Sequence, residues 1–191
     1  MRQSLIAATV ALALSAAVAP SSFAAQKKHA AKKGGGDSMF VTNAAKGGMA
    51  EVELGKMATE KASSDQVKQF GQRMVDDHSK ANDELKGIAQ QKNMTLPTEI
   101  DAKDKALRTR LSKLSGAAFD RAYMHAMLAD HRKDVNEFRM ESKAGTDTDI
   151  KAFATKTLPT LEDHLKMAQD TTKAVGTSGT MPKKEKYPPK H

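Results

Sequence analysis

Three Asp-His pairs are the residues of this chain whose types and spacing could do chemistry: Asp77-His78, Asp130-His131 and Asp163-His164. A neutral imidazole can bind a metal ion, and a nearby carboxylate can hold that imidazole in one orientation. The segments 70–85 and 123–138 overlay when the chain is shifted by 53 residues, so the first two pairs belong to an internal repeat. The repeat indicates that two helices present their histidines in the same way.

Helical geometry predicts that all three histidines face inward. At about 100° per residue, side chains three or four positions apart, or seven positions apart, share a helix face. Each Asp lies about 100° from its histidine, where it could orient a histidine of a neighbouring helix or pair with a surface lysine. Apolar residues share the face of each histidine: Met74, Val75 and Leu85 for His78, Met127, Leu128 and Phe138 for His131, and Leu161, Met167 and Ala168 for His164.

Glu51 is a fourth candidate, on the first long predicted helix. Its face also carries Gly47, Gly48 and Gly55. A glycine inside a helix costs about 1 kcal/mol relative to alanine, so three on one face indicate close backbone packing or room for an opposing group. Glu51 and the three histidines, one from each long helix, would form a compact polar layer.

Two interpretations of this layer remain open. In the first, Glu51, His78, His131 and His164 bind a zinc, copper or iron ion. In the second, the layer is a hydrogen-bonded structural element that fixes helix register, and the nearby methionines only fill the core. Under the first interpretation, the supporting residues would be Asp77, Asp130 and Asp163, together with Met74, Met127 and Met167, which would also suit Cu(I).

The elements that position these residues all follow a helical pattern between residues 38 and 175. Long helices are predicted at about 38–62, 63–93, 117–143 and 148–175, the second starting with the capping box Ser63-x-x-Gln66. A shorter helix with the stripe Leu107, Leu111 and Leu114 falls between the second and third long helices. This order predicts an all-α four-helix bundle whose middle connection is either a crossover or a decorated loop.

Residues 1–24 have the pattern of a secretory signal peptide. Arg2 precedes an apolar run from Leu5 to Ala19, and Ser22-Phe23-Ala24 provides the small residues for cleavage near Ala24/Ala25. The mature protein is therefore expected to be periplasmic or secreted, without a transmembrane segment. Because the chain has no cysteine, disulfides and thiolate metal sites are excluded.

The basic charge is predicted to belong to the two ends of the chain. The formal net charge is +8, yet residues 37–175 hold 22 basic and 22 acidic side chains. Residues 25–37 and 176–191 are rich in Lys and Gly, with Pro in the second, and are predicted to be disordered basic tails around a folded domain at 38–175. Such tails could contact anionic surfaces of the cell envelope or simply increase solubility. Nucleic acid is not an expected partner, and the sequence assigns no oligomeric state.

Several short motifs resemble a bacterial ferritin-like family of unknown function, whose members are often labelled as exported or outer-membrane proteins. The motifs are Ala50-Glu51-Val52, Met74-Val75-x-Asp77-His78, Phe119-Asp120-x-x-Tyr123, Asp130-His131, and Leu158-Pro159 followed by His164. The resemblance implies a ferritin-like four-helix bundle over about 38–172 and brings no activity with it. The chain departs from the Glu-x-x-His motif of ferritin-like di-iron enzymes, because Val75, Leu128 and Leu161 stand three residues before the histidines. With a single inward carboxylate expected, di-iron chemistry is disfavoured.

These features predict an exported, non-catalytic envelope protein that binds a metal ion or small ligand in its Glu/His layer. The sequence has no Ser-His-Asp set, phosphate-binding loop or close carboxylate pair that would indicate hydrolysis. A structural or stress-related envelope protein without a ligand is the alternative, and a metal-dependent oxidoreductase is a third. Metal binding to the purified protein would distinguish the first from the second.

Overall fold

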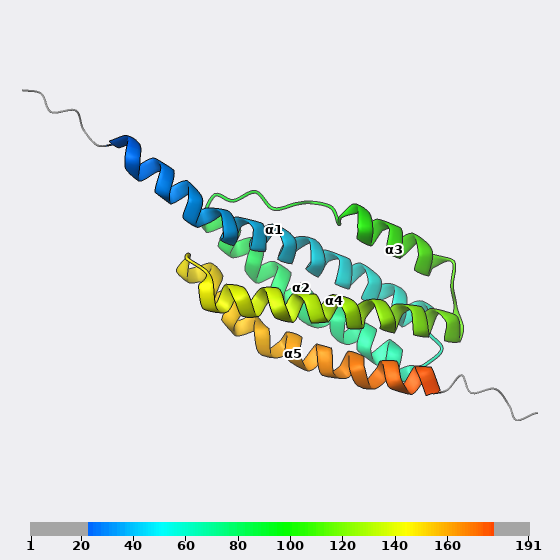
Figure 1. Cartoon of the computed structure of the whole chain (residues 1–191). Helices are drawn as coiled ribbons and strands as arrows, with labels where there is room; N and C mark the ends of the chain where they lie inside the picture. Colours follow the sequence, from blue (N-terminus) through cyan, green and yellow to red (C-terminus); the bar gives the residue numbers. More distant parts are fainter. Residues whose placement is uncertain (1–22, 178–191) are drawn as a thin grey trace, which may run out of the picture. The chain divides into compact units, whose positions relative to one another are not determined.

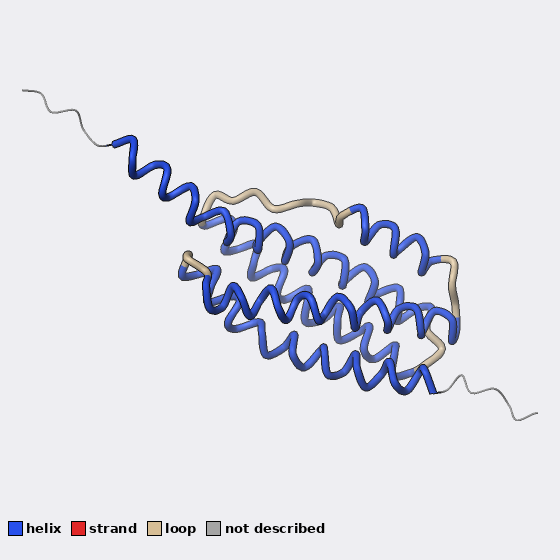
Figure 2. Tube along the Cα trace, viewed as in Figure 1, coloured by secondary structure: helices blue, strands red, loops and turns tan. Residues whose placement is uncertain are grey.

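The computed structural model describes residues 23–177, and side chains are described for residues 35–176. Over this range the chain forms α-helices and no strand (Figure 1, Figure 2). The chain divides into two units, Met1–Lys32 and Lys33–His191, and the second contains every side chain discussed below. The helices are α1 Phe23–Lys61, α2 Asp65–Gln91, α3 Ala102–Ser112, α4 Gly116–Ala144 and α5 Thr148–Thr177.

The helix boundaries match the sequence prediction closely except at the first helix. α1 begins at Phe23 rather than near Ser38, so its first turns cover residues 25–37, for which a disordered tail is predicted. The alanines and lysines of this stretch are good helix formers, which explains how the helix can extend there. Most of the predicted signal peptide (1–22) and most of the predicted C-terminal tail (178–191) lie outside the described residues.

The start of α2 corrects one detail of the sequence prediction. Ser64, not Ser63, is the residue before the helix, and its side chain makes no capping hydrogen bond. The backbone N–H groups of Ser63 and Ser64 instead donate to the carboxylate of Asp120 on α4, each over 3.0 Å. The capping box is therefore wrong, because a buried carboxylate from another helix satisfies these donors in place of a local side chain.

The contacts at the helix ends define how the long helices run. The α1–α2 turn touches Asp120 near the start of α4, and Lys92 after α2 contacts Asp147 after α4 over 2.8 Å. α2 and α4 therefore run in the same direction, and their connection must return along the length of the molecule. Figures 1 and 2 show this connection, with α3 inside it, following α1 back to the start of α4. The open choice between a crossover and a decorated loop is thus resolved in favour of a crossover.

Two hydrophobic clusters fill the space between the helices, and six buried aromatic residues belong to them. The first cluster includes Phe70, Phe119 and Tyr123, whereas the second includes Phe40, Phe138 and Phe153. Along every long helix, one polar residue separates the part in one cluster from the part in the other. These residues are Glu51 on α1, His78 on α2, His131 on α4 and His164 on α5.

Glycines bring α1 and α2 into close contact beside this layer. A Cβ atom at Gly55 would lie 2.6 Å from the carbonyl oxygen of Gly71, and one at Gly71 would lie 2.7 Å from Cβ of Ala58. The two backbones can approach this closely because neither glycine has a side chain. The glycine-rich face of the first helix therefore serves close backbone packing at Gly55. None of the helices in the described part of the chain combines the length and apolar composition needed to cross a membrane.

Candidate metal centre

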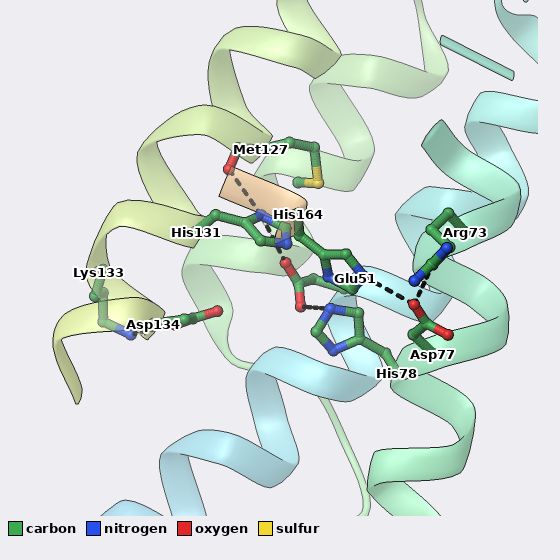
Figure 3. A network of polar contacts seen from close by, with 9 residues as sticks. All are labelled: Glu51, Arg73, Asp77, His78, Met127, His131, Lys133, Asp134 and His164. Atoms are coloured by element: carbon green, nitrogen blue, oxygen red, sulfur yellow. Dashed lines mark hydrogen bonds and ion pairs between the residues drawn. The ribbon is translucent and has the colours of Figure 1, made fainter. Parts of the chain in front are cut away.

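Four long helices bring Glu51, His78, His131 and His164 together in the interior (Figure 3). Glu51, His131 and His164 have no exposed surface, and His78 is also buried. The imidazole centroids lie 5.3 Å apart for His78 and His164, 5.4 Å for His131 and His164, and 5.9 Å for His78 and His131. One ligand nitrogen of each histidine lies within 4.8 Å of one from each of the others. The layer predicted from helical faces is therefore a real cluster in the structure.

Glu51 lies between two of the imidazoles. Its Oε2 is 2.7 Å from Nε2 of His78, and its Oε1 is 3.2 Å from Nδ1 of His131. A cavity of about 20 Å³ borders Glu51 and His78, which is enough space for a water molecule or a metal ion. Of the four cluster residues, Glu51 and His78 line this cavity.

Two of the imidazoles are held in a defined tautomer by a second contact. His131 donates from Nδ1 to the carbonyl oxygen of Met127 over 2.9 Å, because a carbonyl can only accept. His164 donates from Nε2 to Oδ2 of Asp77 over 3.0 Å, and the same oxygen accepts a hydrogen bond from Arg73 (Figure 3). The proton on one nitrogen leaves a lone pair on the other nitrogen of the same ring.

In His131 and His164, the ring nitrogen that does not make this second contact is buried and has no hydrogen-bond partner. This holds for Nε2 of His131 and Nδ1 of His164, and also for Nε2 of His78, whose contact with Glu51 lacks hydrogen-bond geometry. Both carboxylate oxygens of Glu51 are likewise without a hydrogen bond. An imidazole fixed through one nitrogen, with the other nitrogen free, is the arrangement of a metal-ligating histidine.

The charges of the cluster are strongly coupled. Burial opposes ionisation of Glu51, but the nearby His131 and His78 outweigh it and lower the pKa of Glu51 to about 2. Burial also lowers the pKa of His78, yet the charge of Glu51 outweighs it and the pKa of His78 is raised. Burial and the other imidazoles lower the pKa of His164 to about 4 despite its bond to Asp77. At neutral pH the cluster therefore holds a carboxylate and at least one neutral imidazole, His164, whose lone pair is available.

The structure gives different places to the predicted supporting residues. Asp77 lies beside the site and orients a histidine of a neighbouring helix, whereas Asp163 is exposed at the surface. Met127 contacts His131 through its carbonyl oxygen, and Met74 and Met127 belong to the first hydrophobic cluster. Met167, which is partly buried, packs against the same cluster. The methionines therefore lie in or against the core, as expected if they only fill the space between the helices.

The expectation of a single inward carboxylate is wrong. Asp130 and Asp134 on α4 each place a carboxylate oxygen within 4.8 Å of one another and of Glu51. Burial and the charge of Glu51 raise the pKa of Asp130, and the same two causes raise that of Asp134 well above its ordinary value. The sequence prediction missed Asp134, although its spacing of three residues from His131 places both on one helix face.

The histidine cluster has the donor set of a metal centre. Three imidazoles and one carboxylate can provide four nitrogen and oxygen ligands to zinc, iron or Cu(II). Residues 20–171 match the sequence family described as "Domain of unknown function (DUF4142)". Searches of curated proteins and of solved structures found no match.

Proposed function

The chain belongs to the family of the domain of unknown function DUF4142, and we propose that it is a metal-binding protein whose centre is the Glu51/His78/His131/His164 cluster. The ligand would be a zinc, copper or iron ion. The proposal does not require catalysis.

One observation carries the proposal. Each of the three imidazoles has a buried nitrogen without a hydrogen bond, and each ring places a nitrogen within 4.8 Å of one from each of the other two. Leaving a buried polar atom unpaired costs about 1–3 kcal/mol, so several such atoms in one place need a compensating ligand. A metal ion compensates them all at once, since it binds lone pairs and neutralises the charge of Glu51.

The same observation weighs against a purely structural layer. A polar layer that only fixes helix register is stable when its members satisfy one another. Here Nδ1 of His131 is bonded to Met127 and Nε2 of His164 is bonded to Asp77. The other ring nitrogen of each histidine has no hydrogen-bond partner. This division of roles favours a ligand-binding site.

The donor types favour a borderline metal. Imidazole nitrogen and carboxylate oxygen suit zinc, Cu(II) and iron. Cu(I) prefers soft sulfur ligands, and the methionines near the site lie in or against the hydrophobic core. Zinc is therefore the first probe to use.

We further propose that the fold is a ferritin-like four-helix bundle and that the protein is exported to the periplasm or beyond. The parallel course of α2 and α4, joined by a crossover, supports the first part. The signal-like pattern of residues 1–24 supports the second. Fractionation of cells producing the protein, with N-terminal sequencing of the processed chain, tests the export: a start at Ala25 in the extracytoplasmic fraction is expected.

Zinc titration of the purified, chelator-treated protein tests the metal centre. Wild-type protein is expected to bind Zn²⁺ at the histidine cluster, and His131→Ala or His164→Ala to weaken that binding by about 100-fold or more, because each removes a ligand. His125→Ala is the matched control, since His125 is on the same helix as His131 but is exposed. Thermal melting without metal shows whether each variant is folded.

The stability of the protein provides a second measurement. A ligand that binds only the folded state at 100 times its Kd stabilises that state by about 2.7 kcal/mol. Zinc is therefore expected to raise the melting temperature of wild type and of His125→Ala, but not of folded His164→Ala. Equal zinc affinity in wild type, His131→Ala and His164→Ala would overturn the proposal.

A further inference from the structure

A second group of carboxylates lies beside the histidine cluster, on the side formed by α1 and α4. It comprises Glu51, Asp130 and Asp134, each of which has a carboxylate oxygen within 4.8 Å of the other two. Asp130 and Asp134 are one helical turn apart on α4, so both point from the same face of that helix. Their side chains are only 16% and 13% exposed, and Glu51 is fully buried.

The protein neutralises this group only in part. The oxygens of Glu51 lie 2.7 Å from Nε2 of His78 and 3.2 Å from Nδ1 of His131, and neither contact has hydrogen-bond geometry. The nearest cations of Asp130 and Asp134 are Lys103 at 3.6 Å and Lys133 at 3.7 Å, beyond hydrogen-bond distance. These lysines are 71% and 54% exposed, so water screens much of their attraction. Three carboxylates this close repel one another, and either bound protons or a cation among them relieves that repulsion.

Two cavities give a cation access to these oxygens. The larger, of about 180 Å³, is lined by four aspartates, Asp101, Asp104, Asp130 and Asp134, and by three lysines, Lys46, Lys103 and Lys133. The smaller, of about 20 Å³, is lined by Glu51, His78 and Asp134. Asp134 lines both cavities, so its carboxylate borders the larger cavity and also the smaller one beside Glu51.

We infer that Glu51, Asp130 and Asp134 form a second cation site, distinct from the histidine cluster, for a divalent cation that prefers oxygen ligands, such as Mn²⁺. Carboxylate oxygens are the ligands of hard cations, whereas three imidazoles select a borderline metal, so the two sites differ in preference. The site extends the proposed function and shares only Glu51 with it. Its other ligands, Asp130 and Asp134, have no part in zinc binding by the histidines.

Titration with Mn²⁺ in the presence of saturating Zn²⁺ tests the site, with free Mn²⁺ counted by electron paramagnetic resonance. Wild-type protein is expected to bind one equivalent of Mn²⁺. Asp130→Asn and Asp134→Asn are each expected to weaken this binding by at least about tenfold, because each removes a charged ligand, and the double variant to abolish it. Asp163→Asn is the matched control, because this aspartate is exposed.

The outcomes separate this inference from the proposed function. Zinc binding without any Mn²⁺ binding at millimolar concentration overturns the second site alone, as does Mn²⁺ binding by the double variant at wild-type strength. Zinc binding that does not depend on the histidines, with Mn²⁺ binding lost in the double variant, overturns the histidine centre alone. A metal-free melting temperature of the double variant at or above that of wild type is expected, since the substitutions remove repulsion, and it shows that the variant is folded.

Discussion

Asp77 on α2 accepts a hydrogen bond from Nε2 of His164 on α5, over 3.0 Å, although the two residues are 87 positions apart in the chain. The bond fixes the proton on Nε2, so Nδ1 of His164 faces the cluster as a lone pair. Arg73 holds the same oxygen of Asp77 from one turn away. Although burial opposes it, the bonds from His164 and Arg73 lower the pKa of Asp77, so the acceptor remains ionised.

Asp77→Ala is therefore expected to weaken zinc binding without removing a ligand. The variant frees the ring of His164 to rotate and to change tautomer, and loss of such an orienting partner typically costs 10–100-fold in metal affinity. Zinc titration measures the effect. Asp163→Ala, which removes the exposed Asp next to His164 in sequence, should bind zinc like wild type. Equal affinity of Asp77→Ala and Asp163→Ala would show that the bond does not orient a ligand.

Glu141 on α4 is expected to make the stability of the protein depend on pH. Burial and repulsion from Asp37 raise the pKa of Glu141 to about 7, from an ordinary value of 4.5. Between these values the folded state keeps a proton that the unfolded state has lost, so the free energy of unfolding falls as pH rises from about 4.5 to about 7. Below this window Glu141 is protonated in both the folded and the unfolded state, so it does not change the free energy of unfolding. Above the window it is ionised in both states, and the free energy of unfolding falls no further.

Glu141→Gln should remove this loss, because the amide is neutral at every pH. Urea unfolding in the presence of a chelator is expected to show the variant about 2 kcal/mol more stable than wild type at pH 8 and close to it at pH 4.5. Glu60→Gln, at an exposed position of α1, serves as the control and should match wild type at both pH values. A constant difference between Glu141→Gln and wild type across the pH range would contradict the shifted pKa.

Gly71→Ala is expected to destabilise the protein by about 1–3 kcal/mol. The added Cβ would lie 2.7 Å from Cβ of Ala58 and 2.8 Å from the carbonyl oxygen of Gly55, so α1 and α2 must move apart. Gly87→Ala on the same helix meets nothing within 4 Å and should be neutral or stabilising by up to about 1 kcal/mol. Chemical denaturation of both variants measures the contrast, and a stable Gly71→Ala would mean that the helices do not depend on this close approach.

The sequence alone predicted the helical class, the order of the long helices and the inward direction of four polar residues. Helical periodicity is a local property, so the faces of His78, His131 and His164 follow from their own neighbours in sequence. The same reasoning identified Glu51 from the residues of its own helix. The start of α1 and the capping of α2 were less predictable, because tail composition and a short motif carry weaker signals.

The tertiary structure alone decided which of these residues meet and what surrounds them. The bond between Asp77 and His164 joins α2 to α5, and the approach of Asp130 and Asp134 to Glu51 joins α4 to α1. Neither contact could be predicted from the helical periodicity of the sequence. Periodicity predicts which side chains are buried, but not which residue of a neighbouring helix they meet or how the helices are aligned along their length. The direction of α4 relative to α2 determines that alignment, and the crossover through α3 sets that direction. Thus the sequence determined the proposed ligand residues, whereas the packing of helices decided that two of the imidazoles are held by a second contact and that a second group of carboxylates lies beside them.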